Sequence, residues 1–325
     1  MVQSDSRNHH PGVDNRGPFF SMNPFSSRCC QHNHAMGWPY YAQNLVLASA
    51  DGGAAILTYS DCQATLMVGS GQRVTLDEQT HYPFGEDVLI TVGGLGRKGS
   101  ATFPLYLRIP AWTTDAHVQV NGQTIDCRPT EGLLRISRTW KDGDRVQLYL
   151  PMRLSLRRWA LNKNSVSVDY GPLTMSLLIK ERRQQADSRQ TAIGDSHWQE
   201  GADASQWPTT EIYAASPWNY ALVPCVKGMR VERTAWPQDN YPFALESVPL
   251  RVKASGALVP SWGQDETGLC QVLPDACQPR GEVEQLTLIP MGAARLRISA
   301  FPPCEGNTAC GQCGSCCGTA PMTER

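Results

Sequence analysis

The chain has 325 residues, room for two domains, and its formal net charge is -1 with 18% of the residues charged. A net charge near zero does not indicate the basic surface of a nucleic-acid-binding protein. The sequence has no run of about 18 apolar residues, so no membrane span is predicted. We therefore expect neither nucleic acid nor membrane as a partner. The compartment is not indicated, and a homodimer is left open as the assembly.

Residues 1–28 are rich in turn-forming residues and in aromatics without a period, which predicts an irregular segment. Residues 35–50 have apolar side chains at helical spacing, and the sequence Asp51-Gly52-Gly53 is typical of a helix C-terminus. One helix is therefore expected here, immediately after the cysteine motif considered below.

From residue 54 onward the apolar pattern changes to period two, and turn signals recur about every 8–12 residues, as in an antiparallel β-sandwich. Asn121-Gly122 suits the type I′ turn of a hairpin, because both positions accept positive φ. The fold class is thus predicted as mainly β, with a β-sandwich over residues 53–183. Its strands are expected at 55–59, 63–68, 73–77, 87–92, 103–109, 117–120, 123–125, 133–136, 145–150, 165–170 and 173–179.

A polar stretch at 181–207 predicts a linker or long surface loop, and a second β-rich domain or extension is expected over 184–303. Its strands are predicted at 211–213, 222–223, 250–254, 283–289 and 294–298. The tail, 304–325, contains Cys310, Cys313 and Cys316 with two-residue gaps, a spacing found in metal knuckles. The segment is Gly- and Ser-rich with little apolar support, which favours a disordered tail or foreign sequence from a misread gene end instead.

The densest group of reactive side chains is at residues 28–34, where Cys29 and Cys30 are adjacent and His32 and His34 follow. Thiolates are nucleophiles and zinc ligands, so the pair is a candidate catalytic or metal site. Two buried apolar thiols or a vicinal disulfide are the structural alternatives. The two histidines share a face on a strand but not on a helix. A closed zinc site needs four ligands, so further ligands must come from elsewhere.

Several motifs, in their order along residues 20–300, resemble glycoside hydrolase family 127, the β-L-arabinofuranosidase-like proteins once classed as a domain of unknown function. Each motif is short, and the ordered combination is what makes the resemblance specific. The motifs are Arg28-Cys29-Cys30-Gln31-His32-Asn33, Gly37-Trp38-Pro39, Phe103 to Trp112, Val120-Asn121-Gly122, Ile136 to Asp144, Leu150-Pro151-Met152 and Tyr170-Gly171-Pro172-Leu173.

The resemblance implies an (α/α)6 barrel followed by β-sandwich domains, with residues 1–52 as the C-terminal remnant of that barrel. It implies Zn2+ held by a glutamate and three cysteines, with Cys29 as nucleophile and zinc ligand and Cys30 as zinc ligand. A separate glutamate is the acid/base of a retaining reaction on an arabinofuranoside-type carbohydrate. Residues 1–28 contain no Glu and no Cys. We therefore expect the C-terminal portion of such an enzyme, inactive alone.

Carboxylates downstream, Glu78, Glu86 and Asp87, are expected on solvated strands and turns rather than in a catalytic role. Two other functions are weighed against the glycosidase. One is a non-catalytic carbohydrate-binding or structural β-sandwich module that stacks sugars on exposed aromatics, although a buried core position is the default for each tryptophan. The other is a cysteine-based metal or redox protein centred on the tail. The tryptophans considered for stacking are Trp112, Trp140, Trp159 and Trp218.

Overall fold

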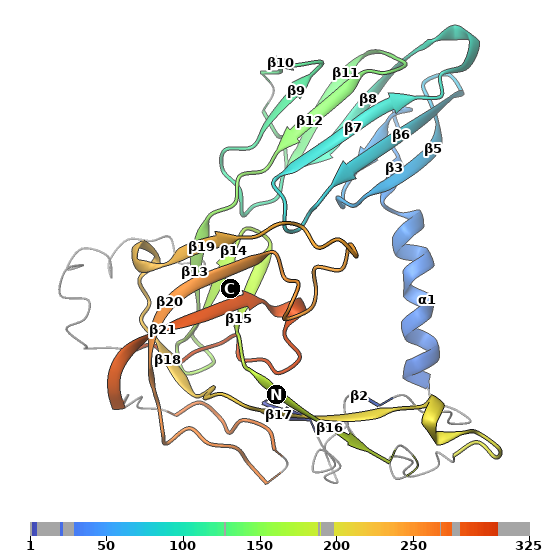
Figure 1. The fold of residues 1–325 in the computed structure, drawn as a ribbon. Helices are drawn as coiled ribbons and strands as arrows, with labels where there is room; N and C mark the ends of the chain where they lie inside the picture. Colours follow the sequence, from blue (N-terminus) through green and yellow to red (C-terminus); the bar gives the residue numbers. More distant parts are fainter. Residues whose placement is uncertain are drawn as a thin grey trace. The chain divides into compact units, whose positions relative to one another are not determined.

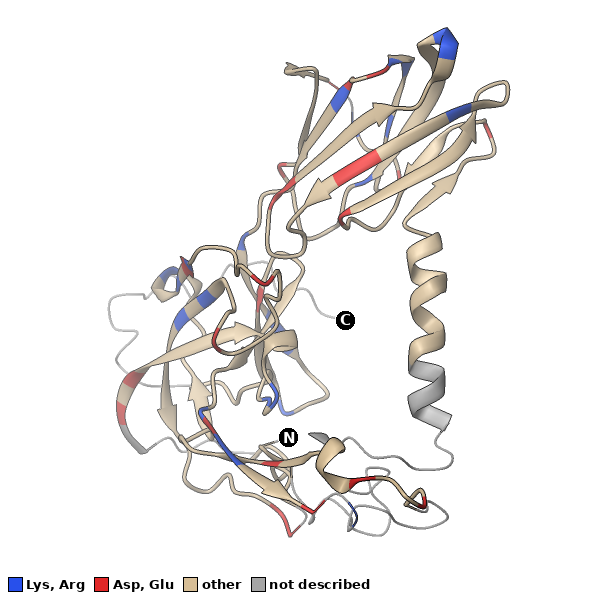
Figure 2. Ribbon diagram, turned by 45° about the vertical axis from the view of Figure 1, so that its right-hand side comes forward, with Lys and Arg blue, Asp and Glu red and all other residues tan. Residues whose placement is uncertain are grey.

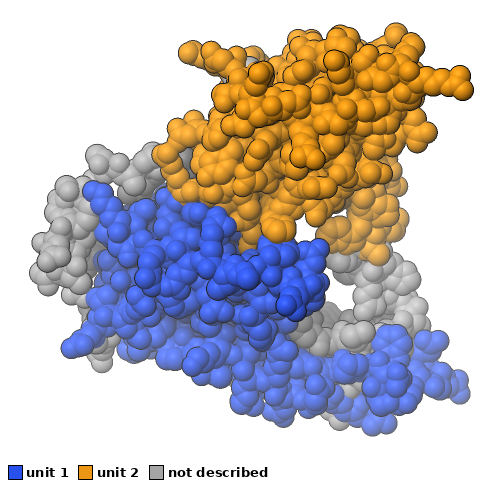
Figure 3. Space-filling model, turned by 45° about the horizontal axis from the view of Figure 1, so that its top comes forward, with its two compact units in different colours: residues 1–29, 154–325 blue, residues 30–153 orange. Residues whose placement is uncertain are grey.

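The computed structural model describes residues 2–4, 20–21, 29–126, 128–187, 189, 198–266, 268–274 and 280–304, with the side chains of 20–21, 29–34 and 280–281 excepted. The chain divides into two compact units (Figure 3): unit 1 comprises residues 1–29 and 154–325, and unit 2 comprises residues 30–153. Strands dominate both, which confirms the mainly β prediction (Figure 1).

Unit 2 contains two sheets. The six-stranded sheet has the order β10-β9-β12-β7-β6-β5 and the four-stranded sheet has the order β11-β8-β4-β3. Pairing is antiparallel except between β4 and β8, where Ala54 lies opposite Leu105 in a parallel pair. The strands are β3 (Val46–Ala48), β4 (Ala54–Ile56), β5 (Cys62–Val68), β6 (Gln72–Thr80), β7 (Asp87–Gly93), β8 (Ser100–Arg108), β9 (His117–Val120), β10 (Gln123–Thr124), β11 (Leu133–Lys141) and β12 (Arg145–Tyr149).

One hydrophobic core lies between these two sheets, because each strand turns alternate side chains inward. Along β8 the inward face includes Phe103, Leu105 and Leu107, and along β11 it includes Ile136 and Trp140. The six-stranded sheet contributes Val74, Leu76, Val88, Ile90, Val92, Val118, Val120, Val146 and Leu148 to the same core.

Unit 1 is built on a seven-stranded sheet with the order β13-β14-β15-β21-β20-β18, to which β19 adds by pairing with β20. A smaller sheet has the order β1-β17-β16, and β2 also pairs with β17. The strands are β1 (Gln3–Ser4), β2 (Phe20–Ser21), β13 (Leu154–Trp159), β14 (Ser165–Tyr170), β15 (Leu173–Leu177), β16 (Glu181–Ala186), β17 (Thr209–Ala214), β18 (Tyr220–Leu222), β19 (Arg230–Arg233), β20 (Leu250–Leu258) and β21 (Arg280–Pro290).

The helix differs in its bounds from the prediction of 35–50: α1 spans Cys29–Gln43. Residues 46–48 form β3 instead, because pairing with β4 satisfies their backbone groups in a sheet. The glycines expected to end a helix lie in the turn between β3 and β4. Gly52 has φ of 75°, and a Cβ on Gly53 would lie 2.7 Å from the Ser49 hydroxyl, so this turn requires small residues.

The prediction of a polar loop over 181–207 is wrong for its first six residues, which form strand β16. Among the described strands, β16 pairs with β17 alone and therefore lies at a sheet edge. Polar side chains are common on edge strands, so the alternating apolar pattern that predicts a strand is missing here. Residues 294–298 alternate as predicted but form no strand. They are joined to β15 by single hydrogen bonds, such as Leu177 N–H to the Ile298 carbonyl at 2.8 Å.

Charged residues are scattered over both units rather than gathered in one patch of the described structure (Figure 2). Within the same residues, no helix has the length and apolar character that crossing a membrane requires. Cys304 is buried, whereas Cys310, Cys313 and Cys316 lie outside the described residues, so metal binding by the tail stays a prediction.

Candidate functional site

The adjacent cysteines lie in the first turn of α1, the only α-helix in the described part of the chain. Their side chains are outside the described structure, so the roles predicted for Cys29 and Cys30 stay predictions. His32 and His34 also lie in α1, and their side chains are likewise outside the described structure.

The remainder of α1 exposes large apolar side chains. Met36, Trp38 and Tyr40 are each about 60% exposed, and Tyr41 is 45% exposed and meets Trp38 edge-to-face. Helices of globular proteins normally bury such residues, and an exposed group of them marks an interaction surface. We call residues 36–41 the α1 aromatic surface.

Glu78 on β6 occupies the core rather than the solvated surface, which corrects the prediction for this residue. It is 2% exposed, and its Oε1 accepts a hydrogen bond from the Ser60 backbone N–H at 2.9 Å. Its Oε2 is buried without a hydrogen-bond partner among the described residues. The sequence did carry the signal, because Glu78 follows Val74 and Leu76 at period two on the inward face.

Burial, assisted by the nearby Asp61 carboxylate, raises the pKa of Glu78 to about 8, against the opposing effect of the Ser60 N–H. Cys62 lies directly across from Glu78 on β5, and burial followed by the charge of Glu78 raises the pKa of its thiol to about 11. At neutral pH Cys62 is therefore a thiol, which is a poor nucleophile and a poor metal ligand.

The other two carboxylates have structural surroundings. Glu86 is half-buried and accepts hydrogen bonds from the Met152 N–H at 2.6 Å and the Tyr149 hydroxyl at 3.1 Å, which joins two ends of unit 2 strands. Asp87 is exposed at the start of β7, in agreement with its predicted surface role.

The four tryptophans considered for sugar stacking are mostly core residues. Trp140 is fully buried, and Trp218 is buried against Trp262 with ring centroids 5.2 Å apart. Trp112 is half-buried against the core of unit 2. Trp159 is 36% exposed, but its indole N–H donates to the Ser167 hydroxyl and Arg157 covers its ring.

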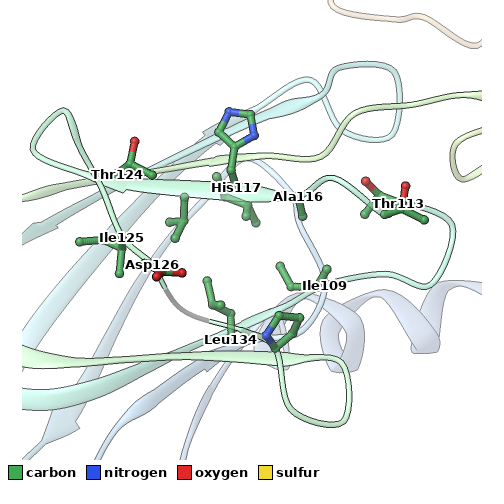
Figure 4. Close-up of a pocket in the computed structure, with 12 residues that line it drawn as sticks. Ile109, Thr113, Ala116, His117, Thr124, Ile125, Asp126 and Leu134 are labelled. Carbon is green, nitrogen blue, oxygen red and sulfur yellow. The ribbon is translucent and has the colours of Figure 1, made fainter.

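A cavity of about 450 Å3 lies within unit 2 (Figure 4). Its lining is chiefly aliphatic, with Ile109 and Leu134 among the residues labelled in the view, while the side chain of His117 points away from the space. Asp126 directs its carboxylate inward and is the only acidic residue of the lining. Since glycoside hydrolysis requires a pair of groups, this cavity by itself has no catalytic constellation.

Comparison with known families matches residues 54–152 to the model described as the β-L-arabinofuranosidase, GH127 middle domain. These residues lie within unit 2 and cover its two sheets from β4 to β12. No curated protein matches the sequence at a significant level.

Three solved structures share the fold over most of the chain. A GH127 β-L-arabinofuranosidase from Geobacillus stearothermophilus T6 has a TM-score of 0.61 and 20% identity, over 93% of this chain and 41% of that one. A protein described as a glycoside hydrolase has a TM-score of 0.60 and 19% identity, over 93% and 43%. A GH127 β-arabinofuranosidase has a TM-score of 0.55 and 18% identity, over 88% and 42%. The chain thus spans about two fifths of the length of the structures it matches.

Proposed function

We propose that the chain is part of a retaining glycosidase of the β-L-arabinofuranosidase type, because residues 54–152 match the model of the GH127 middle domain. The match of these residues is the observation that carries the proposal. The fold shared with longer glycoside hydrolases over 93% of the chain supports it. The substrate class is a carbohydrate with an arabinofuranoside-type sugar.

Cys29 is the proposed nucleophile. Its thiolate attacks the anomeric carbon and forms a glycosyl thioether, while a carboxylic acid protonates the departing glycosidic oxygen. Water, deprotonated by the same carboxylate, then cleaves the carbon–sulfur bond and releases the sugar with its configuration retained. The position of Cys29 in the first turn of a 15-residue helix supports this role, because a helix N-terminus favours negative charge.

Cys29 and Cys30 are also the proposed zinc ligands. Thiolates are preferred zinc donors, so the pair fits the metal in kind, and a bound zinc ion keeps a thiol ionised. The pair does not fit in number. The described residues contain no group of three His, Cys, Asp or Glu side chains that could hold a metal ion, and residues 1–28 contain no Glu or Cys. We propose that the remaining ligands and the acid/base glutamate lie outside these 325 residues and that the chain alone is inactive.

The α1 aromatic surface supports this division of the site. Trp38 and Tyr40 are 60% and 64% exposed, and a further element packed against α1 would bury them. We propose that α1 is the last helix of an (α/α)6 barrel and that barrel helices cover this surface in the whole enzyme.

An incomplete ligand set makes a prediction about metal content. The purified 325-residue chain is expected to hold well under one zinc ion per molecule at the cysteine pair, because two thiolates alone bind zinc much more weakly than four ligands. Mass-spectrometric metal analysis is compared for the wild type, the Cys29→Ser/Cys30→Ser double variant and each of these without residues 304–325. One zinc ion per chain that is lost only in the double variant contradicts the proposal, whereas zinc lost only with the tail assigns it to the tail cysteines.

The nucleophile assignment is tested in protein that also carries the helical catalytic domain. There, Cys29→Ser is expected to lower kcat/KM for an aryl β-L-arabinofuranoside by at least about 10³-fold, since the covalent step is lost. Cys62→Ser is the matched control, because this half-buried thiol is held on β5, and it is expected to leave the rate within about twofold. Equal losses in the two variants, or no loss in Cys29→Ser, would remove Cys29 from the mechanism.

A further inference from the structure

We propose that unit 1 carries a non-catalytic saccharide-binding site at residues 241–248, which we call the aromatic turn. This goes beyond the proposed glycosidase function and uses none of its residues. Two observations combine here: a pair of exposed aromatic rings, and a cavity lined by later residues of the same turn, whose wall includes a buried carboxylate with an unpaired oxygen.

The aromatic pair consists of Tyr241 and Phe243, which are 53% and 38% exposed. Their ring centroids are 6.4 Å apart with an interplanar angle of 66°, so an edge of one ring meets the other. The edge-to-face contact leaves aromatic surface open to solvent. Phe243 also lies close to Gly292, where a Cβ would come 3.0 Å from the ring, and the neighbouring Met291 is 41% exposed.

Hydrogen bonds hold the aromatic turn in one conformation. The Ser247 hydroxyl donates to the Tyr241 carbonyl at 2.7 Å, and the Val248 N–H donates to the Ala244 carbonyl at 2.9 Å. The Arg251 guanidinium adds a bond to the Leu245 carbonyl at 3.4 Å. The rings are therefore presented by an ordered segment, which lowers the entropy cost of binding a ligand on them.

The turn forms one side of a cavity of about 530 Å3, within the size range of small-ligand sites. Leu245 and Glu246 come from the aromatic turn itself. The segment from the end of β15 into β16 supplies the other side. That side consists of Leu178, Lys180, Glu181 and Arg183.

Glu181 is the buried group of this wall, with 4% of its side chain exposed. Its Oε2 accepts bonds from Arg183 Nε and Nη2 at 3.2 and 2.9 Å, and Arg295 Nη1 lies 3.7 Å from it as an ion pair. Its Oε1 and the Nη1 of Arg295 have no hydrogen-bond partner among the described residues. An acceptor and a donor are thus unpaired on one ion-paired cluster.

A hydroxyl group matches this cluster, because it donates one hydrogen bond and accepts another. Sugars combine such hydroxyls with C–H faces that pack on aromatic rings, the pairing offered by the cavity and the turn. Both signs of charge line the cavity, with Lys180 and Arg183 against Glu181 and Glu246, so it favours a neutral ligand over an anion or a cation.

Affinity electrophoresis of the full chain through gels with soluble arabinan, arabinoxylan, galactan or mixed-linkage glucan tests the site. Only the choice of arabinose polymers rests on the proposed function. At least one polysaccharide is expected to retard the wild type, and Tyr241→Ala/Phe243→Ala to weaken that binding at least tenfold. Trp38→Ala/Tyr40→Ala is the matched control, because it removes two exposed aromatics from unit 2 and should bind like the wild type.

Two further variants test the role of Glu181 and the independence of this site from the cysteine pair. Glu181→Gln, with its fold checked by circular dichroism, is expected to weaken binding because the unpaired carboxylate oxygen is changed. Cys29→Ser/Cys30→Ser is expected to bind normally, so failure of the glycosidase proposal leaves this result intact. The proposal is overturned if no polysaccharide retards the wild type, or if the aromatic-turn variant binds normally. It is also overturned if that variant migrates differently only because it breaks up a self-associated form of the chain.

Discussion

Trp140→Ala is expected to lower the free energy of unfolding of unit 2 by about 4 kcal/mol, the range for removing a large buried aromatic side chain. Trp140 on β11 is completely buried, and its ring centroid lies 5.8 Å from that of Phe103. Its indole N–H donates a hydrogen bond to the Phe103 carbonyl at 3.0 Å. The substitution leaves a cavity and removes a bond between β11 and β8. The cavity lies in the core between the two sheets, whereas the lost hydrogen bond joins neighbouring strands of one sheet.

Urea unfolding followed by far-ultraviolet circular dichroism measures this loss, since the signal does not depend on the removed indole. Trp140→Phe retains most of the apolar volume and should cost about 1–2 kcal/mol, largely through the lost hydrogen bond. Trp38→Ala, at a position 60% exposed, should stay within about 0.5 kcal/mol. A loss below about 1.5 kcal/mol in Trp140→Ala would show that this core relaxes around the gap.

Glu78→Gln is expected to stabilise unit 2 at neutral and alkaline pH and to remove most of its pH dependence. The pKa of Glu78 rises from 4.5 unfolded to about 8 folded, so the folded state holds a proton that the unfolded state releases. The contribution to stability is therefore complete below about pH 4.5 and is lost as the pH rises through about 8. Glutamine stays neutral throughout and avoids this loss.

The size of the effect follows from about 1.4 kcal/mol per unit of pKa shift, which gives about 5 kcal/mol above pH 8. Urea midpoints at pH 5, 7 and 9 are the measurement, and the advantage of the variant should grow along that series. The groups around Glu78 belong to the unit 2 segments and α1: Asp61, Cys62, Tyr41, Tyr59 and Tyr82. A constant difference between variant and wild type would mean that Glu78 is ionised in the fold at all three pH values.

Asp51→Asn provides a control of opposite sign. Hydrogen bonds from Ser49, from Tyr106 and then from Arg135 lower the pKa of the exposed Asp51. A carboxylate with a lowered pKa contributes stability above its unfolded pKa and loses it as the pH falls through the folded pKa. Asp51→Asn should therefore destabilise unit 2 at neutral pH, and this destabilisation should become smaller as the pH falls. The effect of Glu78→Gln also becomes smaller as the pH falls, but that effect is a stabilisation.

Local signals in the sequence were sufficient for much of unit 2. Period-two patterns located β5, β6, β7, β8 and β12, because each strand has one face in the core. The Asn121-Gly122 turn was predictable since φ values of 52° and 78° suit these two residues. Strands β13 and β19 escaped prediction, as did β16, where polar edge positions lack the alternating pattern.

The resemblance to glycoside hydrolase family 127 was also readable in the sequence, and the GH127 middle-domain model matches residues 54–152. The burial of Glu78, by contrast, depended on pairing β6 with β5 and closing the second sheet over it, which brings together residues as distant as Ser60 and Leu107. The cavity at the aromatic turn likewise joins Glu181 to Glu246 across 65 positions of sequence. Sequence patterns report which face of a strand is apolar, whereas only long-range packing decides which polar group that face must enclose.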